Sequence, residues 1–170
     1  MIPEAMRRLD PPDVHYLNAA SGWLDLGNLA EAWAELDRIA TGCQDDPEVL
    51  EMRWRLEAES GFWEESLHTA SRLLEVAPSS PAGWIHRSYS LHELKRTEEA
   101  RQHLLQAVQS FEDLPVIPYN LACYACQLGH LDEARRWIGR VVELQGKDAT
   151  KRMGLADPDL TPLHAEIARL

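Results

Sequence analysis

The sequence predicts an all-α fold of about four stacked, antiparallel helical hairpins, followed by C-terminal capping helices. The main observation is an interval of 34 residues, which separates Pro47 from Pro81 (81−47) and Pro81 from Pro115 (115−81). The same interval or its double relates two series of small residues: Gly27, Gly61 and Gly129, and Ala32, Ser66, Ala100 and Ala134. A repeat of this length is typical of helical hairpins that stack into an open array.

The interval divides most of the chain into repeat units that together form one domain, as the length of 170 residues suggests. Each unit is expected to hold a helix A and a helix B joined by a tight turn. The predicted units span 13–46, 47–80, 81–114 and 115–146. Residues 1–12 form an N-terminal extension, in which residues 2–9 are expected to add a short helix.

The fourth unit shows the predicted hairpin most clearly. Its helix A is expected from about Pro118 to Leu128, because apolar residues recur there at spacings of three and four. Gly129 follows, where a left-handed helix end favours glycine. Asp132 and Glu133 then lie in the first turn of helix B, where acidic side chains complement the helix dipole.

The segment 120–134, which reads NLACYACQLGHLDEA, resembles the helix A, turn and helix B start of the tetratricopeptide repeat family. The other units align with it without gaps, so the resemblance covers about residues 13–146. It implies a right-handed superhelical α-solenoid. It also implies a concave groove, lined by the A helices, that holds a peptide or helix of a partner protein.

The first three units carry residues at the packing places that the resemblance implies. In the first unit these include Tyr16, Ala20, Trp23, Leu29, Ala32 and Leu36. In the second they include Leu50, Trp63, Ser66, Ala70 and Leu73, and in the third Trp84, Ser88, Leu91, Ala100, Leu104 and Ala107. Trp54 departs from the pattern, because it stands where helices A and B cross and a small residue is expected. Arg53 and Arg87 precede two such crossings, and Arg53 could pair with Glu57; the alternative is that both arginines face an acidic ligand.

After Gly146 the repeat fades, and residues 147–170 are predicted to form the cap. We expect one helix from Asp148 to Ala156 and another from Pro162 to Arg169, separated at Asp157-Pro158 because a residue before proline disfavours helix. The last repeat of an array must cover its apolar face. The residues expected to do so are Met153, Leu155, Leu160, Leu163 and Ile167.

The charge of the chain argues against nucleic acid as a partner. The formal net charge is −11, with −13 in residues 1–133 (10 basic, 23 acidic) and +2 in residues 134–170 (7 basic, 5 acidic). An acidic protein repels phosphate backbones. The basic exception is a cluster that we interpret as helix C-terminal charge complementing the helix dipole. It comprises Arg135, Arg136, Arg140, Lys147, Lys151 and Arg152.

The sequence predicts a cytoplasmic protein without cofactor or metal. No signal core or stretch of about 20 apolar residues is visible, and three cysteines suit a reducing compartment. Cys123 and Cys126 have the spacing of a redox or zinc pair, with His86 and His92 as the nearest further ligands, but they fall inside a predicted helix. A structural role is the favoured interpretation. No catalytic motif is present, so we predict no enzymatic activity.

The predicted function is a protein–protein interaction module. The groove that the resemblance implies would be lined by Leu17, Ser21, Leu24, Met52, Arg55, Ile85, His86, Tyr89, His92, Tyr119, Asn120, Cys123, Cys126 and Gln127. Tyr89 and Tyr119 are the expected anchors, or they simply pack on one another. Nearby glutamates favour an apolar peptide or amphipathic helix with basic flanks. The alternatives are a bacterial secretion-type chaperone for an apolar client segment, a homo-oligomeric assembly subunit that self-associates, and a metal or redox site at the cysteine pair.

Overall fold

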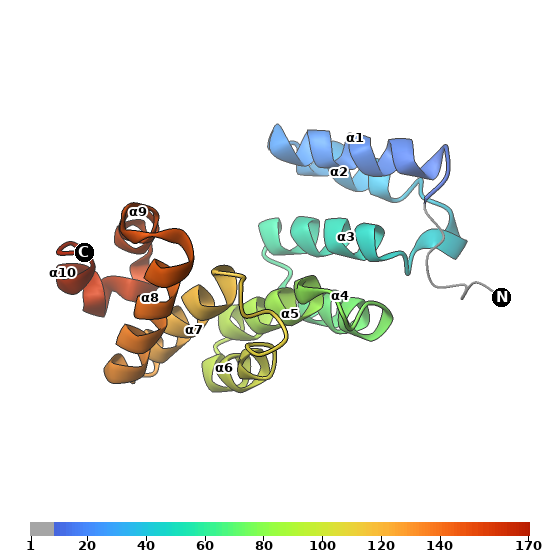
Figure 1. Ribbon diagram of the computed structural model, residues 1–170. Helices are drawn as coiled ribbons and strands as arrows, with labels where there is room; N and C mark the ends of the chain where they lie inside the picture. Colours follow the sequence, from blue (N-terminus) through green and yellow to red (C-terminus); the bar gives the residue numbers. More distant parts are fainter. Residues whose placement is uncertain (1–8) are drawn as a thin grey trace. The chain divides into compact units, whose positions relative to one another are not determined.

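The computed structural model describes residues 9–170, and every regular element in that range is helical (Figure 1). The short helix predicted over residues 2–9 lies, apart from Leu9, outside the described residues. The chain divides into two compact units, Met1–Ser90 (unit 1) and Leu91–Leu170 (unit 2), so the boundary falls inside the third predicted repeat. The predicted all-α fold is confirmed.

Unit 1 contains two complete hairpins and most of a fifth long helix. Helix α1 packs against α2, and α3 packs against α4. A short 3₁₀ turn, η2 (Thr41–Cys43), joins the hairpins. The helices are α1 (Asp13–Asp25), α2 (Leu29–Leu36), α3 (Pro47–Glu59), α4 (Trp63–Val76) and α5 (Pro81–Glu93), whose last three residues belong to unit 2.

Unit 2 contains one further short helix, one complete hairpin and the C-terminal cap. Helix α7 packs against α6, α8 and the cap segment η3, and α9 packs against α8 and α10. The elements are α6 (Thr97–Leu105), α7 (Val116–Gln127), α8 (Leu131–Gln145), α9 (Lys147–Ala156), η3 (Pro158–Leu163) and α10 (His164–Ile167).

The A helices begin where the sequence predicts. Helices α1, α3 and α5 start at Asp13, Pro47 and Pro81. Helix α7 starts at Val116, one residue after the predicted start of its repeat unit and two residues before the helix start predicted near Pro118. Proline is well tolerated there because the first turn of a helix does not use its backbone N–H groups. The B helices are less regular, since α2 and α6 have 8 and 9 residues whereas α4 and α8 have 14 and 15.

The turn between the helices of each hairpin repeats with the same backbone conformation. Gly27, Gly61 and Gly129 have φ of 75°, 74° and 78°, and Lys95, at the corresponding position of the third repeat, has φ of 63°. The next backbone N–H bonds five residues back in every case, as Phe62 does to the Glu57 carbonyl at 2.8 Å. This hydrogen-bond pattern closes helices through a left-handed residue, which glycine adopts without strain.

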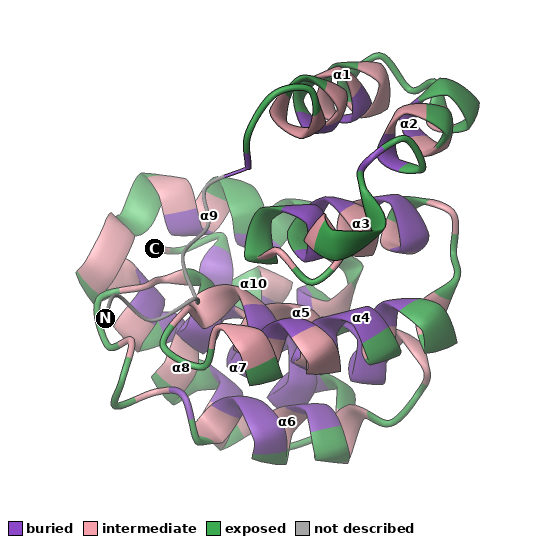
Figure 2. Cartoon of the chain, turned by 90° about the vertical axis from the view of Figure 1, so that its right-hand side faces the viewer, coloured by how far each residue is buried: buried purple, intermediate pink, exposed green. Residues whose placement is uncertain are grey.

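The small residues of the repeat lie where the helices approach most closely. Ala32, Ser66, Ala100 and Ala134 are all fully buried. A fifth small residue, Gly83 of α5, allows closer contact still, since a Cβ there would lie 2.7 Å from backbone atoms of Leu74 in α4. Figure 2 shows the result in α3, α4 and α6, each of which carries both buried and exposed residues along its length.

The cap covers the end of unit 2 with three of its five predicted apolar residues. Leu160, Leu163 and Ile167 are fully buried, whereas Met153 and Leu155 are exposed on α9. The first cap helix agrees with the prediction, but the second begins as a 3₁₀ segment at Pro158 and is α-helical only over His164–Ile167. The structural reason is that Asp157 is extended and caps η3 by accepting a hydrogen bond from the Asp159 backbone N–H at 3.0 Å.

The dipole interpretation of the basic cluster is wrong. Neither α8 nor α9 has a basic side chain in its last turn. Arg135 instead pairs with Asp132 and Glu166, and Arg140 pairs with Glu143. Two of the six residues of the cluster, both on α8, are therefore engaged in ion pairs.

Candidate functional site

Three aromatic side chains of unit 1 come together around a hollow of about 450 Å³. The Tyr89 ring lies 6.2 Å from that of Trp54, nearly perpendicular to it, and 5.9 Å from that of Trp63. Tyr89 is 39% exposed, an unusual state for so large a side chain in a packed helix. The unit-1 hollow is lined by Leu24, Asp25, Trp54, Arg55, Ala58, Glu59, Trp63 and Tyr89.

Trp54 is held in place by polar contacts behind the hollow. Its indole N–H donates to the Ser90 hydroxyl at 3.0 Å, and the Ser90 and Ser66 hydroxyls are hydrogen-bonded at 2.8 Å. Both serines are fully buried. A tryptophan whose indole N–H is held by a buried hydrogen bond offers a rigid ring surface to a ligand.

The imidazole of His86 stacks on Trp54, with ring centroids 3.7 Å apart and planes 8° from parallel. Among residues 9–170, neither ring nitrogen has a hydrogen-bond partner. The nearest carboxylate oxygen, on Glu51, lies 4.0 Å from Nε2, which is beyond hydrogen-bonding distance. Burial, with a smaller effect of the Arg55 cation, lowers the pKa of His86 to about 4. The ring is therefore neutral at pH 7, and it supports the hollow by packing against the Trp54 ring.

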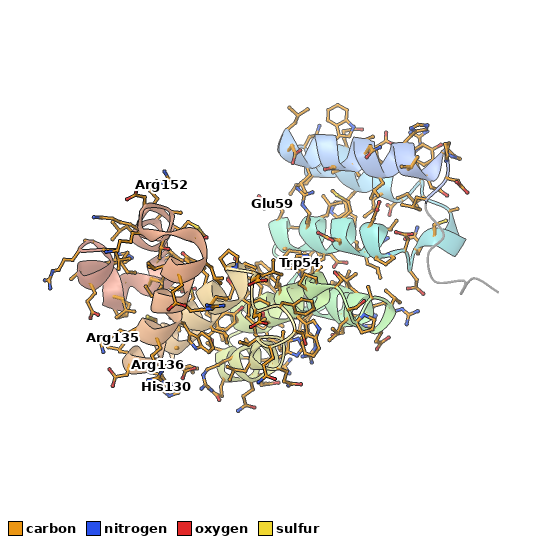
Figure 3. The ribbon with its side chains drawn as sticks, viewed as in Figure 1. Trp54, Glu59, His130, Arg135, Arg136 and Arg152 are labelled. Carbon is orange, nitrogen blue, oxygen red and sulfur yellow. The ribbon has the colours of Figure 1, made fainter. Side chains whose placement is uncertain are left out.

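The rim of the unit-1 hollow is acidic. Asp25 and Glu59 are exposed, and Arg55 pairs with Asp25 at 3.4 Å. Arg55 also donates to the Ser21 hydroxyl at 3.4 Å. The three charged lining residues sum to −1 (two acidic, one basic). In Figure 3, Trp54 and Glu59 both come from α3, Glu59 from its C-terminal end. Aromatic faces beside carboxylates attract a cation.

The face of α7 in unit 2 is covered by the C-terminal segment of the same chain. Tyr119 donates to an Asp157 carboxylate oxygen at 2.9 Å, and Cys123 lies 3.6 Å from the same oxygen. His92 is hydrogen-bonded to Asp159 at 2.9 Å through Nε2 and to Thr97 at 3.0 Å through Nδ1.

The C-terminal end of α7 also contacts the C-terminal segment. The Gln127 side chain donates to the Asp159 carbonyl at 3.1 Å. The polar groups on this face thus hold the Asp157–Asp159 turn.

A family model described as the tetratricopeptide repeat matches residues 52–115. MamA from Desulfovibrio magneticus RS-1 is similar in structure, with a TM-score of 0.71 and 18% identity over 95% of this chain and 94% of that one. The thermophilic TPR protein TTC0263 from Thermus thermophilus gives a TM-score of 0.72 and 18% identity over 93% of this chain and all of that one.

Residues 52–115 therefore match the tetratricopeptide repeat, and the similar solved structures have the same fold as this chain. A third similar structure is YrrB, a TPR protein with an unusual peptide-binding site, with a TM-score of 0.64 and 18% identity over 91% of this chain and 82% of that one. No curated protein sequence matches the chain. Within residues 9–170, no helix has the length and apolar character needed to cross a membrane.

The tetratricopeptide groove residues predicted in unit 1 fall into two groups. Leu17 and Met52 are buried in the hydrophobic core of the unit, so little of either is accessible. The others are at least partly accessible. Leu24, Arg55 and Tyr89 line the hollow, Ser21 and His86 contact its walls, and Ile85 is half-buried on α5.

Sequence reasoning misses Trp54 and Trp63 as members of this site. The repeat pattern assigns Trp63 to hairpin packing alone. Trp54 does carry a signal, because it occupies a crossing position where the repeat expects a small residue. The structure gives the reason: the indole reaches α5, where small Ser90 and flat His86 accommodate it.

In unit 2 the predicted groove residues His92, Tyr119, Cys123 and Cys126 are buried, Asn120 is half-buried and Gln127 is exposed. Their role toward a partner stays a prediction, as does the pairing of Tyr119 with Tyr89. Burial and the Asp157 hydrogen bond raise the pKa of Tyr119 well above its ordinary range.

The cysteine pair lies inside α7, and among the described residues all three cysteines are free. Burial and the nearby carboxylates raise the pKa of Cys126 to about 11 and that of Cys123 further. Thiolates are the reactive and metal-binding form, so both side chains are poor nucleophiles and poor ligands at neutral pH. Among residues 9–170, no group of three or more His, Cys, Asp or Glu side chains is placed to hold a metal.

The two arginines that break the repeat pattern are engaged within the chain. Arg53 donates to Gln44 at 2.7 Å and lies over the Trp33 ring, and Arg87 donates to Ser71 at 3.2 Å. The expected ion pair of Arg53 with Glu57 does not form. Glu57 is buried, and burial raises its pKa above the ordinary value of a glutamate.

Proposed function

We propose that the chain is a non-enzymatic scaffold that binds a partner protein through a short peptide segment anchored in the unit-1 hollow. Tetratricopeptide repeat proteins are generally non-catalytic protein–protein interaction scaffolds. The similar protein YrrB has a peptide-binding site, which supports a peptide as the ligand class.

The single observation that carries the proposal is the convergence of Trp54, Trp63 and Tyr89 on one hollow whose rim holds Asp25 and Glu59. Rigid aromatic residues in a concave site are frequent binding anchors. The rings also attract a cation. Glu59 supplies the carboxylate that pairs with it, because Asp25 is already paired with Arg55. The ligand is therefore a segment that carries Lys or Arg next to an apolar residue, in agreement with the basic flanks predicted from the sequence.

The proposal is tested with a synthetic peptide, Ac-LKLRL-NH2, titrated into the protein while the indole N–H signals are followed by NMR. The Trp54 and Trp63 signals should shift, and Tyr89→Ala should weaken binding at least tenfold with helicity retained. Phe62→Ala is the matched control, because Phe62 is 51% exposed in the same unit but does not line the hollow. Equal effects of the two substitutions would contradict the proposal.

The charge of the rim gives a second arm of the experiment. Glu59→Lys reverses one rim carboxylate while leaving the aromatic rings in place. Binding of Ac-LKLRL-NH2 should weaken, and binding of the acidic analogue Ac-LELDL-NH2 should improve. A variant that affects both peptides equally would indicate binding by apolar contact alone, without recognition of the basic side chains.

A further inference from the structure

A second hollow, of about 720 Å³, lies in unit 2 on the side of the B helices α6 and α8. Its walls come from the end of α6, the turns that follow, the start of α7 and one side of α8. The unit-2 hollow is lined by Arg101, Val108, Gln109, Phe111, Glu112, Ile117, Pro118, Glu133, Arg136, Trp137 and Arg140. Its volume is in the usual range for ligand sites, about 300–1,000 Å³.

The hollow exists because α6 ends at Leu105, several residues earlier than the other long B helices. Residues 106–115 form turns in place of further helix. Arg140 holds this segment by donating to the Glu112 carbonyl at 3.1 Å. The missing helical turns leave space between the segment and α8.

The floor of the unit-2 hollow is apolar. Ile117 is fully buried beneath it, and the side chains of Phe111 and Trp137 are half-buried at its sides. The Trp137 indole is fixed, since its N–H donates to Glu133 at 3.1 Å. Such a floor accepts an aromatic or branched apolar side chain, whose transfer from water is favourable.

Three arginines stand around this floor, and two of them are already engaged. Arg101 makes a bidentate pair with Glu133, with its shortest bond 2.8 Å long, and Arg140 pairs with Glu143 at 2.9 Å. Among the described residues, none forms a hydrogen bond or ion pair with Arg136. The charged lining residues sum to +1 (three arginines, two glutamates) in a chain of net charge −11.

We propose that the unit-2 hollow binds an acidic peptide segment: an aromatic or branched apolar side chain enters the hollow, and a neighbouring carboxylate pairs with Arg136. Charge complementarity argues for this occupant, because the site is basic on an otherwise acidic protein and its unengaged cation stands beside the apolar floor. Arginine suits a carboxylate because its planar guanidinium can form two parallel hydrogen bonds. The carboxylate comes from an Asp or Glu side chain or from a chain terminus. This site is distinct in residues and in charge preference from the one in unit 1.

The probes are the acidic hexapeptide Ac-DELFDE-NH2 and its basic counterpart Ac-KRLFKR-NH2, titrated against the full chain with the Trp137 indole signal as readout. The acidic peptide should shift that signal, and Arg136→Glu should weaken its binding at least tenfold. Arg152→Glu is the matched control, since it makes the same charge change on exposed α9, away from Arg136 in Figure 3. A third peptide, Ac-DELF with a free C-terminus, distinguishes a terminal carboxylate from a side-chain one.

Equal weakening by Arg136→Glu and Arg152→Glu would overturn the proposal, because it would indicate attraction by net charge only. Absence of binding by both acidic peptides at millimolar concentration would overturn it as well. Tyr89→Ala must leave acidic-peptide binding unchanged, so that failure of this site and failure of the unit-1 site are told apart. Helicity and melting temperature, measured for each variant, confirm that the fold is kept.

Discussion

The two hollows of this protein are built from similar materials but have opposite rims. In unit 1, Trp54, Trp63 and Tyr89 stand beside Asp25 and Glu59. In unit 2, Phe111 and Trp137 stand beside three arginines, of which Arg136 is unengaged. Both are formed by helical hairpins of the same repeat type, so the backbone scaffold does not set the ligand preference. The side chains that line each hollow set it.

Each hollow arises where the repeat departs from its own rule. In unit 1 the departure is a tryptophan at a helix crossing, where the other repeats carry a small residue. In unit 2 the hollow follows a B helix of 9 residues, which is shorter than α4 and α8 (14 and 15 residues) but not shorter than α2 (8 residues). Side chains that follow the repeat pattern are used to pack one helix against another. Local departures from a consistent pattern are therefore the places to look for function.

The faces of the A helices differ between the units in a second way. His86 in unit 1 has no hydrogen-bond partner within the described part of the chain on either ring nitrogen, and the rings beside it line an open hollow. His92 in unit 2 is hydrogen-bonded on both nitrogens, one of them to Asp159 of the cap. Unit 2 thus uses its A-helix face to hold the chain's own tail, and unit 1 leaves its face available.

The largest expected effect tests whether unit 2 depends on that tail. Leu160→Ala should lower the free energy of unfolding by about 2–5 kcal/mol, because Leu160 is fully buried and its removal leaves a cavity. Leu155→Ala is the matched control, since Leu155 is 39% exposed on α9, and its effect should stay below about 1 kcal/mol. Urea unfolding followed by circular dichroism measures both. Similar small losses would mean that the segment is a linker and that both A-helix faces are open.

A smaller effect tests the unpartnered imidazole of unit 1. Burial lowers the pKa of His86 to about 4 from an ordinary 6.5, so the unfolded chain takes up a proton first as the pH falls. Stability should be complete above about pH 6.5 and decrease toward pH 4, by at most about 3 kcal/mol, since each pKa unit corresponds to about 1.4 kcal/mol. His86→Phe keeps a ring on Trp54 and should remove this pH dependence, as measured by urea unfolding across that range.

The exposed residue His15 provides the control for this pH experiment. His15→Gln also removes one histidine but should leave the slope of stability against pH between 6.5 and 4 intact. If His86→Phe retains the wild-type slope, the imidazole is solvated or partnered in solution, and the contrast drawn between His86 and His92 fails.

The smallest effect concerns the left-handed turn that joins the helices of each hairpin in both units. Lys95 adopts a left-handed conformation that glycine adopts in the other three turns. Lys95→Gly should raise stability by about 0.5–1 kcal/mol, or roughly 2–4 °C in melting temperature, because the strain of the Cβ is relieved. Gly61→Lys, the reverse change at the matching turn of unit 1, should lower it by a similar amount. Calorimetry of both variants measures the two changes in stability. They must have opposite signs if the left-handed conformation is strained at Lys95.

The repeat can be predicted from the sequence alone. Proline and glycine act locally, so Pro47 and Pro81 predict helix starts, and Gly61 and Gly129 predict left-handed turns, without knowledge of distant contacts. The buried small residues follow from the same period. The break at Asp157 before the last cap segment was also predictable, because proline restricts its neighbour.

The positions of the candidate sites depend on contacts between segments that lie far apart in the sequence. Residues 106–115 contain no residue that must end a helix before Pro115, yet α6 ends at Leu105. The Trp54–Ser90 and His92–Asp159 hydrogen bonds join residues 36 and 67 positions apart. Contacts of this kind depend on how segments pack in space, and side chains far apart in sequence leave no periodic signal. Backbone preferences are local and can therefore be predicted from the sequence. Side-chain packing depends on distant residues and cannot be predicted in the same way.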